Sequence, residues 1–265
     1  MIQIHKYPRT HHIQGSRLQP GDEDLNSIPF AEIAGKYLVV EEKMDGANSG
    51  ISFSDSGELQ LQSRGHYLTG GAREKHYDLF KSWAYTYTGQ LWEVLGSRYV
   101  MYGEWLYAKH TVFYDLLPHY FMEFDILDTQ TRQFLSTSRR KQMLENCPFI
   151  HPVKVLSEGP MHHYEELLNC LGNSFFISDQ HLENLRQAAE NRNLRSEQVL
   201  FETDPSRLME GLYIKVEEEG EVKARYKYVR ADFLTTVLNS QSHWLNRPIV
   251  PNHLHPDAKI FEGEG

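Results

Sequence analysis

The sequence has few cysteines, no long apolar run and no excess of positive charge. Only two of its 265 residues are cysteines, Cys147 and Cys170, and they show no metal-like spacing. No stretch approaches the roughly 18 consecutive apolar residues that a membrane helix needs. The amino-terminal residues show no signal-peptide pattern. We therefore expect a soluble cytoplasmic protein with reduced thiols and no membrane partner.

Positive charge is scarce relative to negative charge. The formal net charge is −9, from 27 Lys and Arg against 36 Asp and Glu. A protein without a basic field binds nucleic acid weakly through the phosphates, which argues against an architectural nucleic-acid binder. An enzyme whose basic residues converge in one cleft is compatible with this charge.

Aromatic residues are plentiful, at 12% of the chain, and they favour a strand-rich core. Apolar alternation and turn signals predict strands over 36–43, 48–53, 58–62, 98–107, 119–128, 211–217 and 222–229. Helical spacing of apolar residues predicts helices over 73–97, 162–171, 179–192 and 231–239.

Strands dominate both flanks of the sequence and helices cluster in its middle, which is typical of an α+β fold with antiparallel sheets. We expect a single domain over residues 1–265, in which 139–207 form a mainly helical insertion. Asp179 is the expected N-cap of the helix over 179–192. Residues 1–35 are punctuated by glycine and proline and predict turns and short pieces.

The segment EEKMDGAN, from Glu41 to Asn48, places a lysine at the end of a predicted strand, just before an Asp-Gly turn signal. Lysine becomes a good nucleophile only when its amine loses its proton. Gly46 permits a sharp turn and a close approach of a ligand. A surface lysine before a β-turn is the alternative interpretation, since so short a pattern also occurs by accident.

Further short motifs follow this one in order along the chain. They are SRG at 63–65, YGEW at 102–105, FMEFD at 121–125, EGLYIK at 210–215 and RYK at 225–227. Together with KMDG at 43–46 they resemble the nucleotidyltransferase signature shared by ATP-dependent ligases and mRNA capping enzymes. Each piece is unspecific, but the ordered set spans most of the chain and is specific.

Within this superfamily the chain is similar to ATP-dependent RNA ligases of the branch typified by the second RNA ligase of T-even phages. Asn48 matches the K-x-D-G-x-N form of that branch. The 38 residues after Lys227 are too few for the OB-fold domain of DNA ligases and capping enzymes. The resemblance therefore implies an adenylyltransferase domain without an OB fold. It also implies ATP as substrate with Mg²⁺ or Mn²⁺, and RNA with 5′-phosphate and 3′-hydroxyl ends. It leaves a partner end-healing enzyme unspecified.

The resemblance assigns Lys43 as the nucleophile that forms lysyl-AMP. Asp45 either assists its deprotonation or fixes the turn. Lys223, Arg225 and Lys227 share one face of a predicted strand, because side chains alternate with a period of two. Three cations on one face suit the α-phosphate and would depress the pKa of Lys43. Which of Lys223 and Arg225 takes the first role stays open.

The same resemblance places Glu210 and Asn48 at the divalent metal, since hard cations prefer oxygen ligands. Glu104 and Arg64 would bind the ribose hydroxyls of ATP. Lys215, in the EGLYIK motif, is grouped with the nucleotide-binding residues.

For the base of ATP, the resemblance suggests that Glu42 reads the adenine amino group. Phe121 is the expected stacking partner of adenine and Phe124 is expected in the core, although the order of these two stays open. Two alternative functions remain. One is a DNA ligase or an mRNA capping guanylyltransferase of the same fold. The other is a non-catalytic nucleotide- or RNA-binding module.

Overall fold

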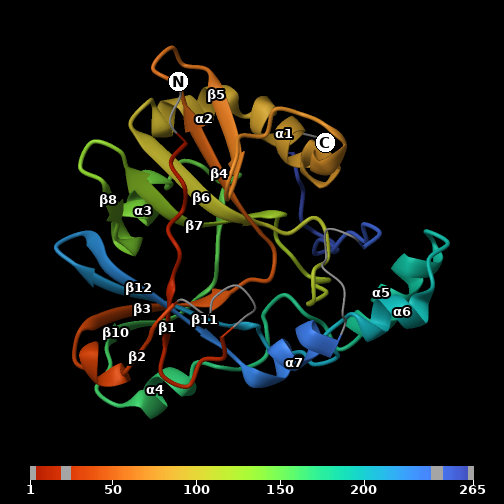
Figure 1. The fold of residues 1–265 in the computed structure, drawn as a ribbon. Coiled ribbons are helices and arrows are strands. Elements are labelled where there is room, and N and C mark those ends of the chain that lie inside the picture. Colours follow the sequence, from red (N-terminus) through yellow and green to blue (C-terminus); the bar gives the residue numbers. More distant parts are fainter. Residues whose placement is uncertain (1–3, 19–24, 240–246, 262–265) are drawn as a thin grey trace.

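Two groups of mostly antiparallel strands build this protein (Figure 1). A computed structural model describes residues 4–18, 25–239 and 247–261. In these residues every strand belongs to one twelve-stranded sheet, whose main path runs β10-β3-β11-β12-β8-β7-β6-β4-β5. The expected α+β class with antiparallel pairing is confirmed, and the described part of the chain holds no separate OB-fold barrel.

The first group of strands, in the lower half of Figure 1, carries the predicted nucleophile. It comprises β1 (His11–Ile13), β2 (Ser27–Ile28), β3 (Tyr37–Lys43), β10 (Val155–Pro160), β11 (Gly211–Glu218) and β12 (Glu221–Val229). Alternation along β3 places Leu38 and Val40 in one buried apolar cluster with Ile214 of β11. The strands predicted at β3, β11 and β12 are confirmed.

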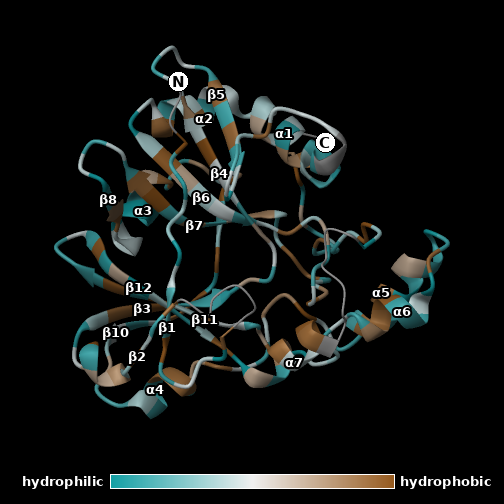
Figure 2. Cartoon of the chain, in the orientation of Figure 1, coloured by the Kyte–Doolittle hydropathy of each residue, from teal (hydrophilic) through white to brown (hydrophobic). Residues whose placement is uncertain are grey.

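The second group lies in the upper half of Figure 1. It comprises β4 (Ala47–Phe53), β5 (Leu59–Ser63), β6 (Tyr99–Trp105), β7 (Phe121–Asp128), β8 (Gln133–Leu135) and β9 (His151–Pro152). β4 and β5 form the predicted hairpin, and Gly57 closes its turn with a φ of 81°. Phe80 and Trp83 pack on Phe121 in the core of this group. Strands of both groups show brown and teal bands in Figure 2, as expected where one strand face is buried.

The helical segment predicted over 73–97 is divided into three helices. They are η2 (Ala72–Tyr77), α1 (Asp78–Thr86) and α2 (Thr88–Leu95). Tyr87, with φ −100° and ψ 18°, leaves the helical conformation between α1 and α2. α2 ends at Leu95 and is followed by Gly96, whose φ of 50° suits glycine.

The segment 139–207 contains helices and also two strands of the sheet, β9 and β10. Its helices are α3 (Thr137–Met143), which begins just before the segment, α4 (Tyr164–Leu168), α5 (His181–Glu190) and α6 (Ser196–Phe201). β10 was not predicted, yet it pairs with β3 along most of its length. The N-cap prediction for Asp179 is wrong, because Gln180 precedes α5 and the Asp179 carboxylate pairs with Arg207 instead.

After β12 the chain forms α7 (Ala231–Asn239), as predicted. The segment beginning at residue 247 then lies beside residues 106–118, where isolated bridges join Ala108 to Pro251 and Leu117 to Leu254. Among the residues described, none of the helices combines the length and the apolar character needed to span a bilayer.

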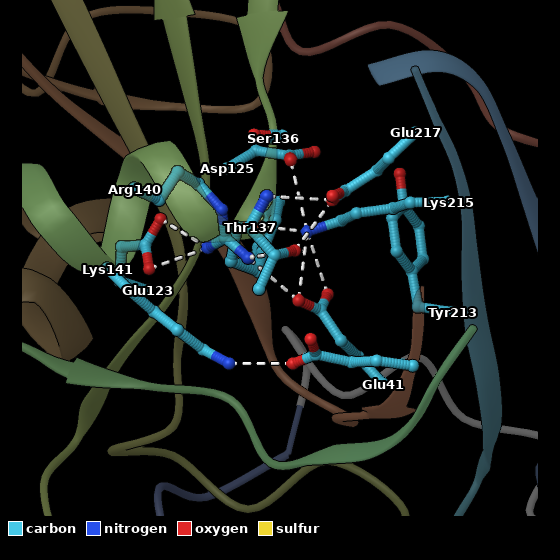
Figure 3. A network of polar contacts seen from close by, with 12 residues as sticks. Glu41, Glu123, Asp125, Ser136, Thr137, Arg140, Lys141, Tyr213, Lys215 and Glu217 are labelled. Carbon is cyan, nitrogen blue, oxygen red and sulfur yellow. Dashed lines mark hydrogen bonds and ion pairs between the residues drawn. The ribbon is translucent and has the colours of Figure 1, made fainter. Parts of the chain in front are cut away.

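Buried charges join the two groups of strands (Figure 3). The Arg140 guanidinium on α3 lies 2.7 Å from Glu123 of β7 and 2.8 Å from Glu41 of β3. Lys215 of β11 is 0% exposed, and its amine lies 2.8 Å from Glu41 and 3.1 Å from Asp125 of β7. Buried ions are tolerated only when they are paired and hydrogen-bonded. This network therefore restrains how β3 and β11 lie against β7.

Arg140→Met should destabilise the fold strongly, because it leaves Glu41 and Glu123 buried without their shared cation. We expect a loss of about 3–5 kcal/mol in the free energy of unfolding, measured by urea denaturation. The matched control is Lys141→Met at the next position. Its ion pair with Glu158 is exposed and should contribute less than about 1 kcal/mol. Equal losses for the two variants would contradict a stabilising role for the network.

Candidate active site

The lysine at the end of β3 meets a glutamate that precedes β11. Gly211, the first residue of β11, pairs with Lys43, which brings Glu210 beside the lysine amine. Lys43 Nζ lies 2.7 Å from Glu210 Oε1, and Glu210 is 1% exposed. A Cβ on Gly211 would lie 1.8 Å from Tyr228 O. Only glycine therefore allows β11 and β12 to approach at this point.

Carboxylates dominate the surroundings of the lysine amine. Burial lowers the pKa of Lys43, but the charges of Glu210, Glu104 and Asp45 outweigh burial and raise this pKa above its ordinary value. The expectation of a depressed pKa is therefore wrong. The physical reason is that three acidic groups act on the amine more strongly than the cations of β12 do.

Two of these carboxyl groups hold their protons more tightly than usual. Burial raises the pKa of Glu104 to about 8, although the charge of Lys43 opposes the shift. Burial likewise raises the pKa of Glu210 to about 7 against the charge of Lys43. Buried acids that face each other with too little positive charge between them are typical of functional sites.

Asp45 is held by a loop rather than by the lysine. Its Oδ2 accepts the backbone N–H groups of Thr111 and Val112, both at 2.7 Å. Its own backbone N–H donates to the Tyr114 hydroxyl at 2.8 Å. Burial raises the pKa of Asp45, and the two backbone donors partly offset that rise. These contacts favour the turn-fixing role over the role of proton acceptor.

Gly46 is closely packed by the protein's own atoms at the end of β6. A Cβ at this position would lie 2.6 Å from Leu106 Cδ2, 2.8 Å from Trp105 O and 2.9 Å from Glu104 Cγ. The turn after the lysine therefore rests directly on the end of β6.

Asn48 and Glu104 are register partners on β4 and β6. Asn48 Oδ1 is buried and has no hydrogen-bond partner among the described residues. Within the same residues, no group of three or more His, Cys, Asp or Glu side chains is arranged to hold a metal ion. A cation at this place would therefore need the amide oxygen of Asn48 or ligand oxygens in addition to carboxylates.

Glu42 lies on the opposite face of β3 from Lys43. It is 1% exposed, and its Oε2 accepts the Phe175 N–H at 3.5 Å. Its Oε1 is buried without a hydrogen-bond partner in the described part of the chain. Burial raises the pKa of Glu42 from 4.5 to about 7. A buried acceptor of this kind matches a ligand that donates an N–H group.

The three cations of β12 separate along the strand instead of acting together. Lys227 lies near the lysine site, because its charge lowers the pKa of Glu210. Arg225 packs on the Phe134 ring at 3.8 Å and lies 3.7 Å from Asp125. Lys223 is exposed at the hairpin end and pairs with Glu221 at 2.8 Å. This exposed position at the hairpin end favours Arg225 over Lys223 for the first role.

Two residues that were predicted to contact the nucleotide, Lys215 and Phe121, are fully buried in the structure. Lys215 is wholly enclosed in the buried charge network and is unavailable to a ligand. Phe121 is 0% exposed between Phe80 and Trp83, so its ring faces are already covered. Phe124 lies instead at the junction of the two strand groups, with its ring centroid 6.1 Å from that of Tyr213. Phe124 is thus buried in the core as expected, and Phe121 is buried in the same core.

Arg64 is exposed just beyond β5. Its charge lowers the pKa of Glu104, so the two predicted ribose contacts lie on the same side of the site. The structure adds two residues that sequence reasoning missed, Tyr114 and Asn252. Their hydrogen bonds join positions 69 to 146 residues apart, and no local pattern signals such contacts.

Comparisons with known proteins agree with this arrangement. The RNA ligase family matches residues 36–229. A lysine-to-methionine variant of Naegleria gruberi RNA ligase, solved with AMP and Mn, is similar with a TM-score of 0.55 at 16% identity. An apo lysine-to-alanine variant of the same ligase gives 0.54 at 18%. Both alignments cover 88% of this chain and 57% of the other. No curated protein matches the chain.

The solved structures show the shared fold, and this chain spans 57% of their length. The family match covers most of the sequence and includes Lys43, Glu104, Glu210 and Lys227. From this match it follows that the chain belongs to the RNA ligase family.

Proposed function

We propose that this chain is an ATP-dependent RNA ligase in which Lys43 becomes covalently adenylylated. The observation that carries the proposal is the 2.7 Å contact between Lys43 Nζ and Glu210 Oε1, set among buried acids at the end of β3. The similar ligase of N. gruberi was solved with AMP and Mn, which supports an adenosine nucleotide and a divalent cation as ligands here.

The proposed reaction has three transfers. The Lys43 amine gives up a proton to solvent and attacks the α-phosphorus of ATP, while Glu210 beside it remains available to hold the divalent cation. The N–P bond forms while the bond to pyrophosphate breaks. AMP then passes to the 5′-phosphate of RNA, which frees the amine, and a 3′-hydroxyl displaces AMP to form the phosphodiester. In-line placement and charge neutralisation dominate such transfers.

The oxygen donors around the amine fit a hard divalent cation. The charge of Glu210 raises the pKa of Glu104, and Glu104 pairs in register with Asn48, whose buried Oδ1 lacks a partner among the residues described. Glu210 and Asn48 would hold Mg²⁺ or Mn²⁺, as the sequence suggested. Such an ion supplies positive charge that stabilises negative charge on the reacting phosphate.

The remaining side chains fit an adenosine nucleotide. Glu42 Oε1 would accept a hydrogen bond from the adenine amino group. Phe124, rather than Phe121, would supply the aromatic face. Glu104 and Arg64 would bind the ribose hydroxyls.

Two cations of β12 would bind the phosphates. Lys227 acts electrostatically on Glu210 and would neutralise the α-phosphate. Arg225, anchored by Phe134 and Asp125, would take the neighbouring position. Charge placed in advance in a low-dielectric site is the main source of stabilisation in such transfers.

Lys43→Ala should abolish formation of a labelled protein. Incubation with α-labelled ATP and Mg²⁺ or Mn²⁺ should give an acid-labile labelled band on a denaturing gel, and α-labelled GTP should give none. Lys36→Ala, an exposed lysine on the approach to β3, is the matched control and should keep the label. Label from GTP would favour the capping enzyme, and no label from either nucleotide would favour the binding module.

The acceptor is tested by joining assays on nicked RNA, on nicked DNA and on single strands. We expect sealing where the reacting ends are RNA. Sealing of DNA nicks alone would favour the DNA ligase alternative.

Glu42→Gln should stabilise the fold at alkaline pH while weakening adenylylation. The folded pKa of Glu42 is raised from 4.5 to about 7. Stability is therefore lost as pH rises through this window and is restored below 4.5. The penalty is on the order of 3 kcal/mol above pH 7. Glutamine keeps the shape and avoids this charge, but it places a donor where the adenine amine needs an acceptor.

The measurement is the difference in melting temperature between this variant and the unsubstituted protein at pH 8 and at pH 4.5. The variant should gain several degrees at pH 8, and the gain should shrink in acid. A gain that is equal at both pH values would contradict a buried charge at Glu42.

A further inference from the structure

The segment 247–255 lies beyond the family match, which ends at residue 229, yet it contacts the loop that holds the turn after the nucleophile. Backbone hydrogen bonds attach it to the loop that follows β6. Lys109 N–H donates to Val250 O, Asn252 N–H to Tyr107 O, and His253 N–H to Tyr114 O, at 2.8 to 2.9 Å. The segment therefore lies alongside this loop and is hydrogen-bonded to it.

Asn252 closes the loop with both atoms of its side-chain amide. Its Nδ2 donates to Leu106 O at 2.7 Å, and its Oδ1 accepts the Tyr114 N–H at 3.0 Å. The Tyr120 hydroxyl also donates to Asn252 O at 2.8 Å. Asn252 is 0% exposed. A buried amide that satisfies backbone groups at both ends of a loop fixes their separation, because leaving either group unpaired is costly.

The closed loop holds the turn that carries the nucleophile. Thr111 and Val112 donate to the Asp45 carboxylate, and the Tyr114 hydroxyl accepts the Asp45 N–H. Gly46 packs against Leu106, the residue to which Asn252 donates. One residue thus separates the side chain of Asn252 from the Lys43–Gly46 turn along each of two routes. The first runs through Tyr114 to Asp45, and the second runs through Leu106 to Gly46.

We propose that Asn252 is a positioning residue for Lys43, acting through Tyr114 and Asp45. Adenylylation needs the amine in line with the α-phosphorus, and a displacement of about 1 Å can slow such a reaction on the order of a hundredfold. Asn252 restrains the turn through the loop and lies outside the proposed nucleotide contacts. This inference rests on the proposed function of Lys43.

The test uses two nearly isosteric variants. Asn252→Asp keeps the acceptor for Tyr114 N–H but sets an oxygen against Leu106 O. Tyr114→Phe keeps the buried ring and removes the hydroxyl that accepts the Asp45 N–H. In single-turnover reactions with α-labelled ATP, both should slow lysyl-AMP formation about tenfold to a hundredfold. The apparent KM for ATP should stay within about threefold, because the nucleotide contacts are unchanged.

A second assay measures the sealing of chemically pre-adenylylated RNA. It distinguishes a role of Asn252 in positioning Lys43 from a role in supporting the whole fold. In that step Lys43 forms no bond, so both variants should seal at nearly the unsubstituted rate. Asn169→Asp and Tyr85→Phe, at exposed positions, are the controls and should leave both steps unchanged. If Asn252→Asp fails to fold, Tyr114→Phe still carries the test.

Two results would overturn the inference. One is a normal rate of lysyl-AMP formation in a folded variant. The other is an equal loss of lysyl-AMP formation and of sealing. A lack of label on the unsubstituted protein is a separate outcome, which would refute the proposed function itself.

Discussion

The pairing of Gly211 with Lys43 is the constraint on which the site depends. The two residues lie 168 positions apart, and their register sets Glu210 against the lysine amine at 2.7 Å. A slip of one residue would turn every side chain of β11 to the other face. A side chain at Gly211 would drive β11 and β12 apart. The Lys43–Glu210 ion pair follows from this one alignment.

Buried acids in this protein fall into two kinds, which differ in how many cationic side chains lie near the carboxyl group. Burial alone would raise the pKa of Asp125, but Lys215, Arg225 and Arg140 together lower it. Such a fully compensated carboxylate supports the fold. Glu104 and Glu210 share mainly Lys43, and their pKa values are raised to about 8 and about 7. That shortage of positive charge costs stability and would be relieved by a bound cation, and buried acids with raised pKa values are typical of functional sites.

Strand pattern and motif order were enough to predict the α+β class, the strand carrying Lys43 and the convergence of Lys43 with Glu210. They failed where the answer depends on which face of a strand is interior. Alternation correctly separates Phe121 from Phe124, but it does not say which ring the helices α1 and α2 cover. It likewise places Lys223 on the face of Lys227 without showing that Lys223 lies at the exposed hairpin end. The raised pKa of Lys43 depends on distances between residues from 43 to 210, which no local pattern contains.

The motif residues therefore define the chemistry, while residues outside the motifs define its geometry. A Lys-x-Asp-Gly turn is intrinsically adaptable, because glycine widens the range of backbone conformations. Here it is immobilised by the end of β6 and by the loop 106–114. That loop is stabilised in turn by an amide from position 252. Since catalysis by positioning requires the nucleophile to be fixed before the substrate binds, the distant contacts are as necessary to the proposed reaction as the lysine itself.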